Sequence, residues 1–161
     1  MVLMKKEKLN KLLTKVFLKH KLSKTHAKIC SDALVNAELV GATGHGVSRL
    51  KMYCDRIRKK LINPKPKFKF KKISQSIMQI DADDSIGFVA ADIGIKKAIE
   101  SAKKTGLGLV GIKRSGHYGL SGYYAEQAVK KNLLTLIFTN APPAIAPHGA
   151  LKTLFGTNPI C

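Results

Sequence analysis

The sequence predicts an α/β protein in which a small helical unit, residues 1–63, precedes an α/β domain, residues 64–161. Three observations support this. Apolar residues recur at helical spacing through the first third of the chain. The pattern then changes to an alternation of Phe and Lys over residues 67–71, which is typical of a strand. After that point, predicted strands and helices follow one another, as in α/β folds.

Three helices are predicted in the first 63 residues. The first carries one apolar stripe, made of Leu9, Leu12, Leu13, Val16 and Phe17. Ser23 is the expected N-cap of the second helix, which ends near Gly41. Its apolar face consists of Ala27, Cys30, Leu34 and Ala37. The third helix follows the sequence GHG and is stopped by Pro64 and Pro66. Its apolar face consists of Leu50, Cys54, Ile57 and Leu61.

The remaining elements alternate. Residues 67–71 predict an edge strand and residues 77–81 a second strand. A helix is expected over 89–104, with Ile93 and Ile99 on its buried side and Gly106 capping its end. The rest of the chain predicts a strand over 109–113, a loop at 115–119, a helix to about residue 131 and a strongly apolar strand over 133–139.

The chain ends in LFGTNPIC, an apolar and strand-like segment. Chain termini usually lie in polar, exposed sequence. We therefore expect the α/β domain to be partial, because the chain is cut short before the fold is complete.

Charge is the unusual feature of the composition. The chain has 29 Lys and Arg against 10 Asp and Glu, a net charge of +19. This excess makes nucleic acid or an anionic surface possible partners. Only four of the 29 are Arg, however, and the lysines are spread along the whole chain. Specific nucleic-acid readers favour Arg, so a solvated Lys-rich surface is the simpler interpretation.

The three cysteines, Cys30, Cys54 and Cys161, form no C-x-x-C pair. Neither a disulfide framework nor a metal site follows from them, and a reducing, cytoplasmic compartment fits best. No apolar run approaches the roughly 18 residues that a membrane span requires.

The sequence GLGLVG at 106–111 matches the dinucleotide-binding pattern G-x-G-x-x-G. That motif must follow a strand and open a helix, so that the pyrophosphate lies at the helix N-terminus. Here the glycines follow a helix and precede a strand. We therefore interpret them as a helix C-cap and a turn, and expect no standard Rossmann motif.

Two histidine segments are candidates for chemistry. His45 and Arg49 are four residues apart, and a helix starting near Gly46 would place them close to one face of its first turn. A His exchanges protons near neutral pH, and an Arg binds a carboxylate, which together suit a 2-oxo acid. His117 lies in the loop SGHYG, where glycines permit close approach to a ligand. From spacing alone both signals are weak, and an ordinary surface His beside a surface Arg is the commoner explanation of the first segment.

With GHGVSRL, SGHYG, TNAPPAIAP and GTNPI in order, the chain resembles the type 2 malate/L-lactate dehydrogenase family from about residue 8 to its end. The resemblance implies a non-Rossmann NAD(P)-binding fold, a homodimer when complete, and NAD or NADP as cofactor. It also implies hydride transfer to or from C2 of a small anionic 2-hydroxy or 2-oxo acid.

The resemblance also implies site residues. His45 matches the family's proton donor and Arg49 the residue that binds the substrate carboxylate. His117 matches a residue of the cofactor loop that some members use as proton acceptor, so the two His roles are shared or exchanged. The other matches are Tyr118, Gly119, Leu120, Ser121 and Asn140 at the cofactor and Thr157 at the substrate.

Two departures from the family pattern stand out. Thr43-Gly44 replaces the usual Asp-Ser before the catalytic His, and His148 replaces a bulky or neutral residue. Two alternatives to a dehydrogenase stay open. The apolar end and the Thr43-Gly44 departure suggest an inactive fragment of such an enzyme, and the net charge of +19 suggests a basic protein that binds nucleic acid or an anionic surface.

Overall fold

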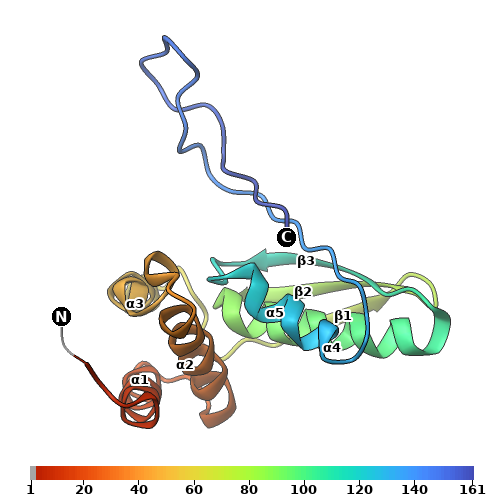
Figure 1. The fold of residues 1–161 in the computed structure, drawn as a ribbon, viewed down its shortest axis with the longest axis horizontal. Helices are drawn as coiled ribbons and strands as arrows, with labels where there is room; N and C mark the ends of the chain where they lie inside the picture. Colours follow the sequence, from red (N-terminus) through yellow and green to blue (C-terminus); the bar gives the residue numbers. More distant parts are fainter. Residues whose placement is uncertain (1–2) are drawn as a thin grey trace.

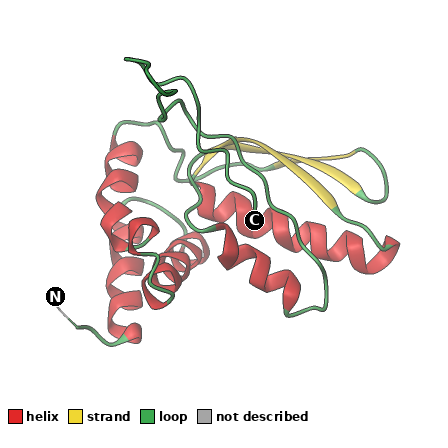
Figure 2. Ribbon diagram, turned by 45° about the horizontal axis from the view of Figure 1, so that its top comes forward, coloured by secondary structure: helices red, strands yellow, loops and turns green. Residues whose placement is uncertain are grey.

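The computed structural model describes residues 3–161, and its helices and strands form two adjoining regions (Figure 1). The first region contains α1 (Lys6–Lys19), α2 (Lys24–Leu39) and α3 (Leu50–Arg58). Two short 3₁₀ turns, η1 (Thr43–His45) and η2 (Val47–Arg49), join α2 to α3. The second region contains a small sheet with α4 (Gly87–Thr105) against it and α5 (Ser121–Val129) packed on α4 (Figure 2).

Local sequence signals account for the first two helices. Leu13 and Phe17 are buried on the predicted stripe of α1, although Leu12 is 50% exposed. The Ser23 hydroxyl accepts a hydrogen bond from the backbone N–H of His26 at 3.2 Å, which confirms the predicted N-cap of α2. The four residues of its predicted apolar face are all buried.

The third helix is shorter than predicted. Lys60 adopts a left-handed conformation with φ 59°, and α3 ends at Arg58, well before Pro64. Leu61 therefore lies outside the helix and is 64% exposed, so its assignment to the apolar face was wrong. Leu50, Cys54 and Ile57 do contribute to the buried side of α3, since each is buried or half-buried.

The sheet of the described residues has the order β1-β2-β3. β1 (Lys69–Lys72) is an antiparallel edge strand on β2 (Ile77–Ser85), and β3 (Leu109–Ser115) is parallel to β2. α4 connects the two parallel strands. Gly106, with φ 81°, caps α4 and leads into β3, as predicted for the GLGLVG segment. A Cβ on Gly108 would lie 2.0 Å from the backbone oxygen of Ala98, so a glycine allows the turn to pack on α4.

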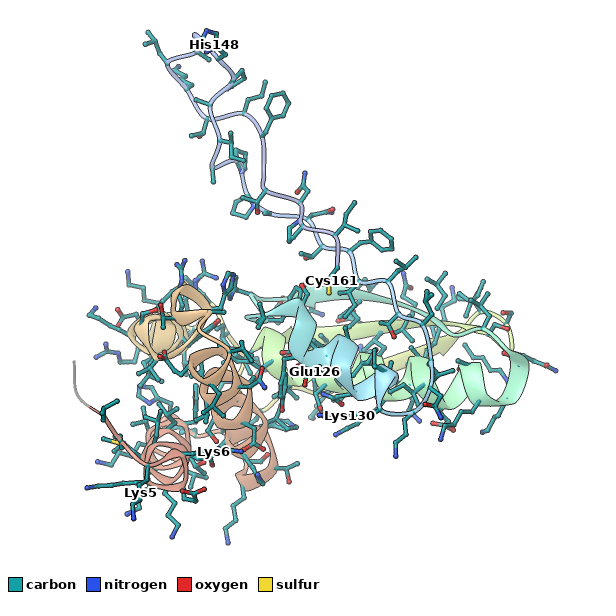
Figure 3. All side chains as sticks on the ribbon, in the orientation of Figure 1. Lys5, Lys6, Glu126, Lys130, His148 and Cys161 are labelled. Atoms are coloured by element: carbon teal, nitrogen blue, oxygen red, sulfur yellow. The ribbon has the colours of Figure 1, made fainter. Side chains whose placement is uncertain are left out.

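The predicted strand over 133–139 is wrong. This segment is irregular except for an isolated bridge between Phe138 and Ile160. A sequence of high β-propensity forms a strand only where a neighbour supplies a hydrogen-bond ladder. Here Ile137 exchanges two backbone hydrogen bonds with Cys161, at 2.7 and 2.9 Å, and Leu134 is 91% exposed. The chain then projects from the body as a long irregular hairpin, with His148 at its tip (Figure 3).

A single cluster of buried apolar side chains joins the helices to the start of α4. It includes Leu13, Phe17 and Leu34 from α1 and α2, and Ile86, Phe88 and Val89 from the first turn of α4 and the residue before it. The division of the chain near residue 63 stays a prediction, and buried residues on both sides of that point belong to this cluster. Within residues 3–161, no helix is both long and apolar enough to cross a membrane.

Candidate active site

The structure brings the two candidate histidines together. His45 is in η1, and His117 is in the loop between β3 and α5. Their rings are stacked, with centroids 5.9 Å apart and planes inclined by 11°. Both side chains are half-buried. Two segments that are remote in the sequence therefore form one candidate site.

His45 and Arg49 do not share a helical turn, which corrects the sequence interpretation. Gly46 has φ −94° and ψ −142° and separates the two 3₁₀ turns that carry these residues. The carboxylate of Glu38, on α2, accepts a hydrogen bond from the backbone N–H of Val47 at 2.7 Å. A Cβ on Gly46 would lie 2.1 Å from that Glu38 oxygen. Glu38 thus fixes the turn, and it is a positioning residue that the sequence analysis missed.

Arg49, in η2, is nevertheless tied to the backbone of η1, the turn that carries His45. Its Nε donates a hydrogen bond to the carbonyl oxygen of Gly44 at 2.8 Å. This contact occupies one of the five N–H groups of the guanidinium and leaves the terminal pair for a ligand. Arg49 is exposed, so its guanidinium is accessible to a carboxylate from solvent.

His117 is held in one tautomer. Its Nδ1 lies 2.6 Å from the hydroxyl oxygen of Tyr53 and accepts a hydrogen bond from the backbone N–H of Gly119 at 3.3 Å. An N–H group that points at Nδ1 requires a lone pair there, so the proton of the neutral ring is on Nε2. Burial lowers the pKa of His117 below its ordinary value of 6.5, and the positive charges of His45, Arg49 and Arg56 lower it further. The ring is therefore neutral at neutral pH.

Tyr53 is the second residue that the sequence analysis missed. It lies on α3, four residues after Arg49, and is completely buried against Phe88, with ring centroids 4.8 Å apart. Burial raises the pKa of its phenol, so the hydroxyl keeps its proton and donates a hydrogen bond to Nδ1 of His117. Its helical spacing from Arg49 was the available signal, but spacing alone does not distinguish a core Tyr from a site residue.

Glycines allow the His117 loop to lie directly on α4. A Cβ on Gly87, the first residue of α4, would be 2.1 Å from the carbonyl oxygen of Gly116 and 2.4 Å from that of His117. Gly119 has φ 78°, and a Cβ there would be 2.6 Å from Cε1 of Phe88. The loop geometry therefore depends on the absence of side chains at both positions.

The other residues predicted to contact a cofactor continue from this loop into α5. The hydroxyls of Tyr118 and Ser121 lie 2.9 Å apart, and Tyr124 donates a hydrogen bond to the carbonyl of Tyr118 at 2.7 Å. Leu120 is the N-cap of α5 and makes no side-chain capping bond with the described residues. The Tyr123 N–H donates to the Leu120 carbonyl at 3.2 Å, whereas the N–H groups of Ser121 and Gly122 have no hydrogen-bond acceptor within residues 3–161 and are open to a ligand.

Asn140 and Thr157 lie elsewhere. Both are exposed and belong to the projecting segment, where Asn158 Oδ1 accepts a hydrogen bond from the N–H of Ala141 at 2.9 Å. No hydrogen bond among residues 3–161 links either of them to His45 or His117. In the same residues, no group of three or more His, Cys, Asp or Glu side chains is arranged to hold a metal ion.

Comparison with known proteins identifies the family of the chain. The family model described as malate/L-lactate dehydrogenase matches residues 4–161. The chain is 40% identical over 139 residues to the malate/(S)-sulfolactate dehydrogenase of Methanothermus fervidus, covering 86% of this chain and 41% of that protein. It is 39% identical over 155 residues to the malate dehydrogenase of Pyrococcus abyssi, covering 96% of this chain and 43% of the relative.

A solved structure of malate dehydrogenase from Pyrococcus horikoshii has the same fold, with a TM-score of 0.94 and 38% identity. The superposition covers 99% of this chain and 46% of that protein. The chain therefore belongs to the malate/L-lactate dehydrogenase family. It spans less than half the length of each of these relatives.

Proposed function

We propose that this chain provides the proton-transfer and carboxylate-binding residues of an NAD(P)-dependent oxidoreductase that acts on small 2-hydroxy or 2-oxo acids. The stacked pair of His45 and His117 beside Arg49 is the observation that carries the proposal. Membership of a family whose named relatives include malate and sulfolactate dehydrogenases supports it. A homodimer and a cytoplasmic location remain expectations from the resemblance.

The hydrogen bonds of His117 suggest how the two histidines divide the work. Nδ1 already has two hydrogen-bond partners, and Nε2 carries the proton of the neutral ring. The ring therefore offers a substrate oxygen an N–H donor but no free lone pair, as a neutral electrophile does. His45 is therefore the residue that exchanges a proton with the substrate oxygen, and the Arg49 guanidinium binds the substrate carboxylate.

The residues around the His117 loop fit a nicotinamide dinucleotide. The N–H groups of Ser121 and Gly122 at the start of α5, together with the Ser121 hydroxyl, offer donors to phosphate oxygens. A Cβ on Gly122 would meet nothing within 4 Å among the described residues, so a ligand can approach the backbone there. Tyr118, Gly119 and Leu120 would complete the contact surface. When bound, the nicotinamide supplies or accepts the hydride at substrate C2.

The test is a steady-state assay of the purified chain with oxaloacetate or pyruvate and NADH or NADPH. We expect His45→Gln mainly to lower kcat and Arg49→Ala mainly to raise KM, while His148→Gln, at the tip of the projecting segment, changes neither. The NMR signals of His45 and His117 should also shift when substrate or cofactor is added. If no turnover occurs and neither signal responds, the chain is an inactive member of the family.

A further inference from the structure

A groove that is separate from the histidine pair lies between the C-terminal ends of α1 and α3 and has a volume of about 530 Å³. Four residues with permanent positive charge line it: Lys19, Lys21, Arg58 and Lys60. The buried side chains of Ile57 and Ile62 also line it and form its apolar floor. None of the described residues that line the groove is acidic.

Most of this charge is not neutralised locally. Arg58 pairs with Asp55, which Lys51 also contacts at 2.6 Å. Among residues 3–161, no ion pair includes Lys19, Lys21 or Lys60. Three ammonium groups around one groove therefore repel one another unless an anion lies between them.

Both helices end in the same motif at this groove. The N–H groups of Lys21 and Leu22 donate to the carbonyls of Leu18 and Phe17, at 2.9 and 3.3 Å. Those of Lys60 and Leu61 donate in the same way to Ile57 and Arg56, at 3.0 and 2.9 Å. These paired bonds define a Schellman motif and occupy carbonyls that would otherwise repel an anion.

The left-handed residue of each motif is a lysine. Lys21 has φ 68° and Lys60 has φ 59°. Glycine is the usual residue at this position, because a Cβ makes the left-handed conformation unfavourable. A preference for positive charge at helix C-termini explains a Lys in the last turn, such as Lys19, but not a Lys at the strained position. Two strained lysines facing one groove indicate that the side chains have a use there.

We propose that this groove binds a small anion that carries several phosphate groups, such as an inorganic polyphosphate or a nucleoside polyphosphate. Lys19, Lys21 and Lys60 would bind phosphate oxygens, with Arg58 at the edge of the groove. The apolar floor of Ile57 and Ile62 offers contact area to an organic group attached to the phosphates. The ligand would thus be distinct from the small 2-oxo acid proposed for the histidine pair.

Calorimetry of the full chain with sodium tripolyphosphate, and separately with ATP, tests the proposal at constant ionic strength. We expect saturable binding and NMR shifts confined to residues 19–22 and 57–62. Tighter binding of ATP would identify a nucleoside ligand, and equal binding would indicate recognition of the phosphates alone. Lys21→Gly/Lys60→Gly removes both charges and both strained side chains, so binding should weaken by at least about tenfold without loss of thermal stability.

A matched variant separates this site from the general charge of the protein. Lys103→Gln/Lys131→Gln removes the same charge from exposed positions on α4 and after α5, and should change the affinity less than about twofold. If the glycine variant does not fold, Lys21→Asn/Lys60→Asn removes the same two charges and introduces a residue that tolerates the left-handed conformation. Equal loss of binding in the matched variant, retained binding in the glycine or asparagine variant, or no saturable binding at all would overturn the proposal.

Discussion

Replacement of Tyr53 by Phe tests whether a buried hydroxyl sets the protonation state of His117. The substitution keeps the aromatic ring that packs on Phe88 and removes only the oxygen 2.6 Å from Nδ1. The N–H of Gly119, at 3.3 Å, remains as a weaker donor to the same nitrogen. The acceptor is therefore not left without a partner.

The substitution should change both the free energy of unfolding and the pKa of His117. The loss of one neutral hydrogen bond with a remaining partner should lower the free energy of unfolding by about 1 kcal/mol, or about 3 °C in Tm for a domain of this size. The lost donor also stabilised the neutral ring, because it pointed at the unprotonated nitrogen. The pKa of His117 should therefore rise toward its ordinary value in the variant.

The measurement is an NMR titration of the His117 ring protons, with urea unfolding followed by circular dichroism. Tyr124→Phe is the matched control, because Tyr124 is equally buried and its hydroxyl makes a hydrogen bond of 2.7 Å to a carbonyl oxygen. It should lose a similar amount of stability and leave the titration of His117 unchanged. An unchanged or lower His117 pKa in Tyr53→Phe would refute the assigned tautomer.

Three further predictions concern packing, pH and ligand binding. Gly87→Ala should lower the free energy of unfolding in urea by roughly 3 kcal/mol, because its Cβ would meet two loop carbonyls. Gly111→Ala is the control: a Cβ there meets open space in the described chain, so the free energy of unfolding should change by less than about 0.5 kcal/mol. Burial lowers the folded-state pKa of both His26 and His117, so the unfolded chain binds protons more readily. Stability should be fully present above the unfolded pKa of 6.5 and fall as pH decreases through the folded values, and His117→Gln should reduce the dependence of Tm on pH. Arg49→Ala should weaken the malate-induced shift of the His45 NMR signal without changing Tm by more than about 1 °C, and a normal response in that variant would remove Arg49 from the carboxylate site.

Apolar periodicity and helix-capping residues predicted most of the elements, because these signals act over a few residues. The stripe of α1, the Ser23 cap and the Gly106 cap each depend on side chains within one or two helical turns. The predictions failed where the structure of a segment depends on a distant strand or on an unusual backbone conformation. Residues 133–139 have the composition of a strand, but no neighbouring strand within the described chain supplies a hydrogen-bond ladder. Lys60 ends α3 in a left-handed conformation, which a lysine in the sequence does not predict.

The site was predictable in its residue types and not in its geometry. His45, Arg49 and His117 stand in recognisable motifs, and the resemblance suggested their roles. Tyr53 lies 64 residues from His117, so no local pattern could pair them. Glu38 was missed for the same reason, because its carboxylate reaches a turn nine residues further along the chain.

The geometry of the histidine pair follows from the core beneath it. Phe88 contacts the ring of Tyr53, and only the missing side chain of Gly119 lets the His117 loop approach it. A Cβ on Gly87, the residue before it, would clash with the carbonyl oxygens of Gly116 and His117, so the loop also depends on a glycine there. The first turn of α4 is therefore part of the hydrophobic cluster and also the floor of the site. The rings of His45 and His117 are stacked and not hydrogen-bonded to each other, so their separation is set by how α4 packs against α2 and α3. A change in that packing therefore alters both the stability of the protein and the chemistry of His117.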